Sequence, residues 1–87
     1  MEEEEEEVPQ EIRIYPNPSL NKALTIQMKE MGSYTVRIFD SFGRLVDHFS
    51  FEGKEYIFSN NNMVNGIYIL EIQSDEEVLF KSKFVIQ

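Results

Sequence analysis

The sequence contains no cysteine and only one histidine, His48, among its 87 residues. Without cysteine the chain has no disulfide framework, no thiolate nucleophile and no zinc site built on sulfur. Glycine and proline are also scarce, with four and three residues respectively. The sequence therefore excludes several kinds of functional site and leaves few positions where special backbone geometry is expected.

Catalytic groups are equally sparse. His48 stands beside Asp47, but adjacent residues of a strand point to opposite faces and cannot form an acid–base pair. Ser50 shares the face of His48 without an acid or an oxyanion donor to complete a triad. The acidic clusters at 2–7 and 75–77 lack the spaced ligands and the glycine of a calcium loop. We expect no catalytic, metal or cofactor-binding site, and hence no enzyme.

Basic residues are few, with 8 lysines and arginines against 16 acidic residues and a net charge of −8. Glu2 to Glu7 carry six of the negative charges, and the remainder of the chain has a net charge of only −2 (−8 plus 6). Because nucleic-acid binding calls for a basic face, a nucleic-acid partner is not expected. Residues 1–11 are predicted to be a disordered acidic leader, either a natural linker or an added expression tag.

Long apolar runs are absent as well. No stretch approaches the ~20 apolar residues of a transmembrane helix, and residues 1–10 lack the apolar region of a signal peptide. The hydrophobic content of 41% is enough for one small core. We therefore expect a single folded domain over residues 12–87 and no transmembrane segment.

What the sequence does contain is alternation of apolar and polar residues, which is typical of strands with one buried face. The alternating apolar positions are Leu24, Ile26, Met28; Tyr34, Val36, Ile38; and Tyr68, Leu70, Ile72. Turn-forming segments separate these runs, including Gly32-Ser33 and Gly53-Lys54. No sustained helical stripe occurs. The pattern predicts an all-β antiparallel sandwich of about seven short strands.

Two turns can be specified. Asp40 and Gly43 occupy the first and fourth positions of a predicted type I turn that joins strand 34–39 to strand 44–51. Asn65-Gly66 is a second turn dipeptide, and Gly66 is expected to have a positive φ. Neither face of strand 44–51 is purely apolar, which predicts a β-bulge or a partly covered second face.

The first and last strands carry further motifs. Pro16 and Pro18 hold Asn17 in extended geometry and end the first strand at Tyr15, a structural role that we favour over partner contact. In the last strand the alternation directs Lys81 and Lys83 outward and turns Phe84 and Ile86 toward the core. The two lysines either guard a sheet edge or take part in partner recognition, and the sequence does not separate these roles.

The order of these motifs resembles a known family. Pro-Asn-Pro at 16–18, Asp-x-x-Gly-Arg-x-Val at 40–46, Gly-x-Tyr-x-x-x-Ile at 66–72 and a basic-apolar end at 81–86 occur in the order found in type A C-terminal sorting domains of the type IX secretion system. The resemblance covers nearly the whole chain beyond the acidic leader. It implies a small immunoglobulin-like β-sandwich.

The resemblance also implies a function. In Gram-negative bacteria such domains direct an N-terminally fused cargo from the periplasm through the outer-membrane translocon. A sortase-like peptidase then usually removes the domain, and the cargo is released or held at the cell surface. Cleavage would fall at or before Glu7 to Glu11, and the signal peptide would belong to a preceding part of the parent protein.

Carried over by position, the resemblance assigns two groups of residues. Gly43, Gly66 and Tyr68 correspond to fold-forming motif positions. Met63 takes the place of a leucine that is usually buried in the family, so it is expected to fill a gap in the core. The segment implicated in partner recognition comprises Lys81, Lys83, Phe84, Val85 and Ile86. Many members end in lysine or arginine, whereas this chain ends in Ile86-Gln87.

An alternative from another class is an immunoglobulin-like accessory or adhesion module that binds carbohydrate or protein. It would use exposed aromatic side chains as a binding platform. The candidates for this platform are Tyr15, Phe39, Tyr56 and Phe58.

Overall fold

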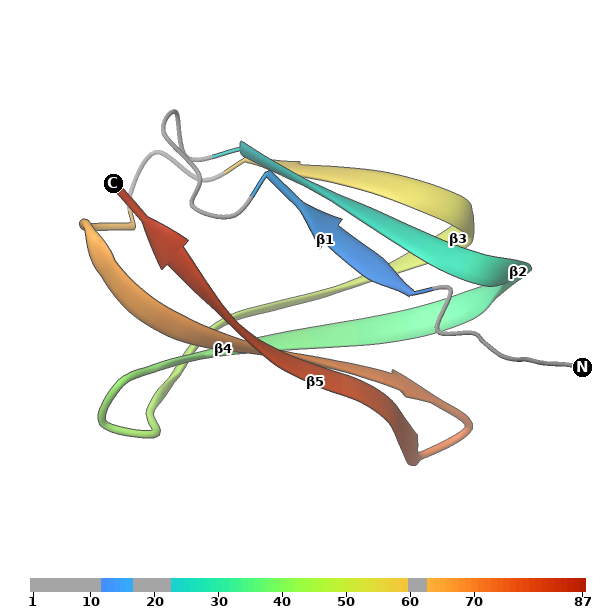
Figure 1. The fold of residues 1–87 in the computed structure, drawn as a ribbon. Helices are drawn as coiled ribbons and strands as arrows, with labels where there is room; N and C mark the ends of the chain where they lie inside the picture. Colours follow the sequence, from blue (N-terminus) through green and yellow to red (C-terminus); the bar gives the residue numbers. More distant parts are fainter. Residues whose placement is uncertain (1–11, 17–22, 60–62) are drawn as a thin grey trace, which may run out of the picture.

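A computed structural model describes residues 12–16, 23–59 and 63–87 of the chain. It contains five antiparallel strands and, in the described residues, no helix that could cross a membrane (Figure 1). The strands are β1 (Arg13–Tyr15), β2 (Ala23–Asp40), β3 (Leu45–Ser59), β4 (Gly66–Ser74) and β5 (Glu77–Ile86). The predicted all-β class is confirmed. The predictions for Asn17, for Pro18 and for the leader up to Glu11 concern residues outside the described part of the chain.

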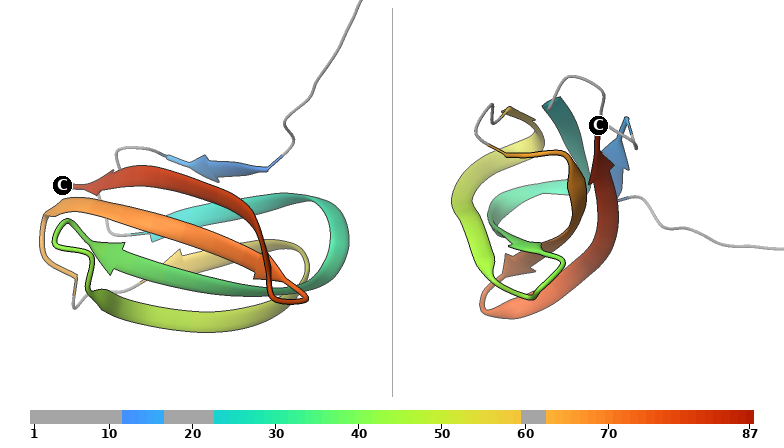
Figure 2. Two further views of the ribbon diagram at one scale, coloured as in Figure 1. Left: turned by 90° about the horizontal axis from the view of Figure 1, so that it is seen from below. Right: turned by 90° about the vertical axis from the view of Figure 1, so that its left-hand side faces the viewer.

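The long strand β2 organises the sheet. Its first half pairs with β1, its second half pairs with β4, and β3 pairs with it along most of its length. Strand β5 pairs with β4 alone. The sheet curls so that its two halves face each other across the core (Figure 2).

The number of strands differs from the prediction of about seven. Gly32 and Gly53 were expected to end strands in turns, but β2 and β3 run through them without interruption. The two glycines are register partners, and the pairing shifts between Gln27 and Gly32. Gly53 has a φ of 122°, which disfavours a β-carbon. The chain bends at these glycines instead of turning back, so two pairs of expected strands merge and the seven-strand sandwich is not confirmed.

The core lies inside the curl, and the predicted alternation places its residues there. All nine apolar residues of the three alternating runs are buried, together with Met63, as expected. The remaining buried apolar side chains are Phe51, Phe58, Phe84 and Ile86. Period-two alternation therefore identified most of the core.

Aromatic side chains of β3 pack beside the bend. Phe49 stacks on Tyr56 and Phe58, with ring centroids 4.9 and 5.2 Å apart, and Phe51 stacks on Tyr56 at 5.2 Å. Tyr34 contacts Phe51 and donates a hydrogen bond to the carbonyl of Glu30 at 2.7 Å. Because Phe58 is 5% exposed and Tyr56 packs against the core, the platform proposed for an adhesion module is not assembled on the surface.

The first half of β3 contains the expected irregularity. Ile38 pairs with Asp47 and Phe39 with Leu45, so Val46 has no partner in the register. This β-bulge leaves Leu45 and Val46 at 49% and 43% exposure. The predicted hairpin between strands 34–39 and 44–51 is confirmed, with the bulge close to its turn.

Candidate functional site

Motifs that are far apart in the sequence meet at one end of the molecule. The β2–β3 turn, the segment leading into β4 and the last residues of β5 lie together there (Figures 1 and 2). The sheet register makes Asp40 the partner of Tyr68, and Gly66 the partner of Ile86. We call this region, residues 40–46, 63–68 and 84–86, the motif end. The start of β1 and the β4–β5 turn lie at the opposite end (Figure 1), and Ile12 lines a shallow groove there together with Leu79.

Asp40 organises the turn of the motif end. Its Oδ1 accepts hydrogen bonds from the backbone N–H groups of Phe42 and Arg44 at 2.9 and 3.0 Å. Its Oδ2 accepts a charge-assisted bond from Nε of Arg44 at 2.8 Å. The backbone N–H of Gly43 donates to the Asp40 carbonyl at 3.0 Å and closes the turn. The carboxylate therefore fixes the backbone over the whole segment 40–44.

These hydrogen bonds also act on the ionisation of Asp40. The backbone N–H of Arg44 is the main cause that lowers the pKa of the Asp40 carboxyl, although partial burial opposes the shift. The Arg44 side chain and the Phe42 N–H act in the same direction as the main cause. The ionised form is thus the form that the turn requires.

The two motif glycines differ in how strongly they require glycine. Gly43 has a φ of 86°, in the left-handed region that a β-carbon penalises. Gly66 has the expected positive φ, but its value of 157° is close to extended backbone, and an added β-carbon would lie 4.0 Å from the Tyr68 ring. Gly43 is therefore the position at which glycine matters more.

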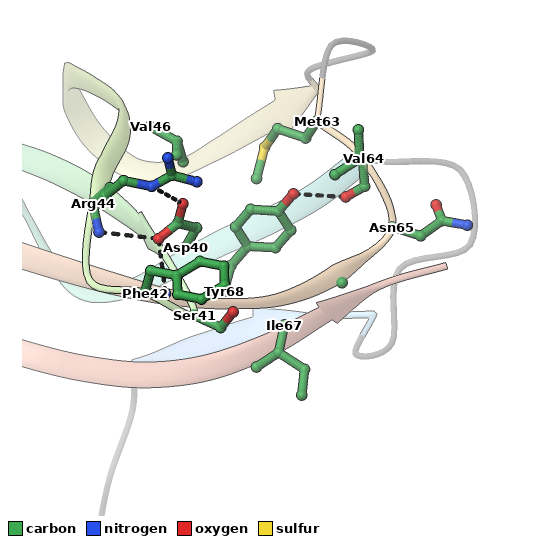
Figure 3. A pocket seen from close by; sticks show the side chains of 11 residues that line it. Asp40, Ser41, Phe42, Arg44, Val46, Met63, Val64, Asn65, Ile67 and Tyr68 are labelled. Atoms are coloured by element: carbon green, nitrogen blue, oxygen red, sulfur yellow. Dashed lines mark hydrogen bonds and ion pairs between the residues drawn. The ribbon is translucent and has the colours of Figure 1, made fainter.

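Tyr68 connects the parts of the motif end. Its side chain is 5% exposed, and its hydroxyl donates a hydrogen bond to the carbonyl of Val64 at 2.6 Å (Figure 3). Its ring stacks on Phe84 of β5 with the centroids 5.6 Å apart. One side chain thus joins β4, the loop before it and the C-terminal strand, in agreement with the expected fold-forming role.

Two grooves open on the surface of the motif end. The first, of about 430 Å³, lies between the Asp40–Arg44 turn and the 63–65 segment, and Figure 3 shows its lining side chains. Phe42, Val46 and Val64 contribute apolar walls. The second, of about 460 Å³, is lined by Phe39, Ile69, Glu71 and Lys81 among others. Asp40, Ser41 and Ile67 line both grooves, so the two grooves are adjacent.

An ion pair that the sequence did not indicate lies at the edge of the second groove. Arg37 donates through Nε and Nη2 to one carboxylate oxygen of Glu71, at 2.8 and 2.6 Å. The Glu71 residue is only 6% exposed, although alternation predicted an outward, wet position. The Arg37 guanidinium also lies 5.5 Å from the centroid of the Phe39 ring. The ion pair can be foreseen only from the sheet register, in which Arg37 is opposite Glu71.

The predicted recognition segment of β5 divides between its two faces. Phe84 and Ile86 are buried at 0% and 2% exposure, whereas Lys81 and Lys83 are exposed and Val85 is half-buried. A partner that binds the folded domain can therefore contact the lysines and Val85 but not the two buried side chains. Phe84 and Ile86 contribute to the stability of the strand instead.

The remaining candidates do not gather into a reactive site. No group of three or more metal-ligating side chains occurs within residues 12–16, 23–59 and 63–87. Asp47 accepts a hydrogen bond from the backbone N–H of His48, so the two side chains form no acid–base pair through that contact. Pro16 is exposed and directly follows β1, and Tyr15 is the last residue of that strand, as expected.

One of two comparisons with known proteins identifies the family of the chain. The family model described as the secretion system C-terminal sorting domain matches residues 13–87. A search of curated proteins found no match. The family match begins at the first residue of β1 and includes all five strands. The chain therefore belongs to the family of C-terminal sorting domains, which act as sorting signals for type IX secretion.

Proposed function

We propose that the motif end is the face by which the outer-membrane translocon of the type IX system recognises this domain. The domain directs its cargo across the outer membrane to the cell surface or into the medium. The observation that carries the proposal is the convergence of three separate motifs at one end of the sheet. The antiparallel pairing of β2 with β4 and of β4 with β5 brings the turn, the 63–68 segment and the C-terminal strand to one end, where they offer a partner a joint surface.

The direction of the chain supports this orientation. Strand β1, the first described strand, begins toward the end opposite the motif end (Figure 2). A cargo attached before the leader would therefore leave the motif end accessible. We infer that cargo and translocon occupy opposite ends of the domain during export.

The later steps follow from the same arrangement. We propose that residues 12–87 form the sorting domain and that residues 1–11 connect it to cargo that has reached the periplasm. A sortase-like peptidase would cut at or before Glu7 to Glu11, ahead of β1 in the sequence. Such a cut separates cargo from domain without unfolding the recognition surface.

A reporter fusion tests the sorting function. A fluorescent protein with an N-terminal signal peptide is joined ahead of residues 1–87 and expressed in a host with the type IX machinery. We expect the reporter to appear at the cell surface or in the medium, and a matched reporter without residues 12–87 to remain in the periplasm. Equal periplasmic retention of the two reporters would contradict the proposed function.

A further inference from the structure

The exposed apolar side chains of this domain are concentrated at the motif end. Of the ten large hydrophobic residues that are exposed in the described part of the chain, five belong to residues 40–46 and 63–68. They are Phe42, Leu45, Val46, Val64 and Ile67. Scattered exposed hydrophobics need no explanation, but such a concentration is typical of interaction sites.

These side chains surround a shaped surface. Ile67 is 49% exposed and lines both of the adjacent grooves, of about 430 and 460 Å³. Each groove is large enough to receive one or two side chains of a bound segment, but neither is an enclosed pocket for a small molecule. The surface therefore fits an extended protein segment that crosses Ile67 and places side chains on both sides of it.

The charges of the surface select the chemistry of that segment. Asp40 is paired with Arg44 and Glu71 with Arg37, so both carboxylates of the surface are already neutralised. Lys81 lines the second groove and takes part in no ion pair within the described residues. Lys83 is exposed two residues further along the same face of β5. The surface thus combines apolar grooves with a positive rim, and it is complementary to an apolar segment with a carboxylate.

We propose that the two grooves beside Ile67 bind an extended segment of the translocation machinery that carries apolar side chains and at least one carboxylate facing Lys81. The proposal rests on the sorting function proposed above and adds the chemical class of the partner. It also assigns a binding role to Ile67 and Val64, side chains outside the C-terminal strand.

Other occupants fit less well. A two-fold interface between copies of this domain would bring the positive rims of both copies toward one shared contact. An anionic membrane surface would call for a larger basic cluster than the pair Lys81 and Lys83. A carbohydrate would call for an exposed aromatic platform, and the grooves are bounded mainly by aliphatic walls on the 63–69 side.

The test uses the reporter fusion with the full chain and two exposed isoleucines in strands. Ile67→Thr removes apolar surface that both grooves share and keeps a β-branched residue in β4. Ile57→Thr is the matched control in β3, because Ile57 is 68% exposed and lines neither groove. Val64→Ser, in the segment before β4, is a second variant that does not depend on strand stability. The secreted and periplasmic fractions of the reporter and the melting temperature of each purified domain are measured.

The expected result is a fall of about fivefold or more in the secreted-to-periplasmic ratio for Ile67→Thr and Val64→Ser, because exposed apolar residues at the centre of an interface dominate its affinity. Ile57→Thr should match the wild type. Equal secretion of all three variants alongside a secreted wild type would overturn the docking surface and leave the sorting function intact. Retention of the wild type itself would instead overturn the sorting function.

Partner chemistry is tested by charge. Lys81→Gln should reduce secretion more than Lys54→Gln, a change at an exposed lysine that lines neither groove. Glutamine is used because Lys81 is opposite Glu71 in the register, where a second carboxylate would destabilise the sheet. Equal effects of the two neutral substitutions would overturn the acidic class of the partner. Sedimentation of the purified domain completes the test, since a dimer that Ile67→Thr dissociates would identify a second copy as the occupant and overturn the proposal.

Discussion

Tyr68 and Asp40 stabilise the motif end by different physical means. Tyr68 buries a large ring and satisfies its hydroxyl on the carbonyl of Val64. Asp40 lies at a turn and satisfies backbone N–H groups that the sheet leaves without partners. The first contribution is mainly hydrophobic, and the second depends on a charge and therefore on pH.

The contributions of Tyr68 can be separated by substitution. Tyr68→Phe keeps the ring and removes the hydrogen bond to Val64, so we expect a loss of about 1 kcal/mol in the free energy of unfolding. Tyr68→Ala also removes the ring and its contact with Phe84, with an expected loss of about 3 kcal/mol. Denaturant unfolding measures both, and Tyr15→Phe at an exposed tyrosine is the control. Equal stability of all three variants would show that Tyr68 does not anchor the fold.

The charge of Asp40 makes a prediction about pH. Because its pKa is lowered in the folded protein, the stability it contributes is present above its ordinary pKa of 3.8 and is lost as the pH falls through the lower folded value. Asp40→Asn removes this contribution at every pH. We therefore expect the variant to melt below the wild type at pH 7, and the difference to shrink as the pH falls below 3.8. A difference that is independent of pH would contradict an ionised role for Asp40.

At the scale of single residues the sequence predicts burial and turns where these depend on one side chain and its near neighbours in the sequence. Alternation placed Tyr68 correctly in the core, the family resemblance did the same for Met63, and the Asp40–Gly43 spacing identified its turn. Glu71 lies on the outward face, as alternation predicted, but it is only 6% exposed and pairs there with Arg37, 34 residues away. Such a pairing follows from strand register, which a local pattern does not contain.

At the scale of strands the main error was the interpretation of Gly32 and Gly53. Glycine between two alternating runs is compatible with a turn or with a bend, because both need backbone freedom. Tertiary structure decides in favour of a bend, because the two glycines are opposite each other in β2 and β3 and both strands bend there. The merged strands carry the core residues of both halves of the sheet. The buried positions predicted by alternation are therefore correct although the number of strands is not.

The bend makes its own prediction. Gly53 has a φ of 122° and open space at the position of a β-carbon, so Gly53→Ala adds backbone strain without a steric clash. We expect a loss of about 1 kcal/mol in the free energy of unfolding. Lys54→Ala, at the exposed neighbouring residue, is the control and should be nearly neutral. Equal stability of the two variants would mean that the bend does not need glycine.

At the scale of the whole molecule the central feature is the meeting of the motifs at one end. The sequence supplied the motifs and their order, from which the family and the sorting function followed. It did not supply their proximity, because the pairing of Asp40 with Tyr68 and of Gly66 with Ile86 depends on the order of strands in the sheet. The grooves and their shared wall at Ile67 depend on the same pairing, so the surface could not be identified beforehand.

The last prediction separates recognition from folding in β5. Lys81 and Lys83 are exposed, whereas Phe84, in the same strand, is fully buried and stacks on Tyr68. Lys81→Ala/Lys83→Ala should therefore change the free energy of unfolding by no more than about 0.5 kcal/mol. A partner with a carboxylate opposite these lysines would nevertheless bind the double variant less well, and secretion of a fused reporter should fall. Lys29→Ala/Lys54→Ala, at two exposed lysines of β2 and β3 that line neither groove, removes the same charge and should leave secretion unchanged. If both double variants are stable and secreted like the wild type, Lys81 and Lys83 serve only to protect an open sheet edge, and recognition must rest on the apolar grooves alone.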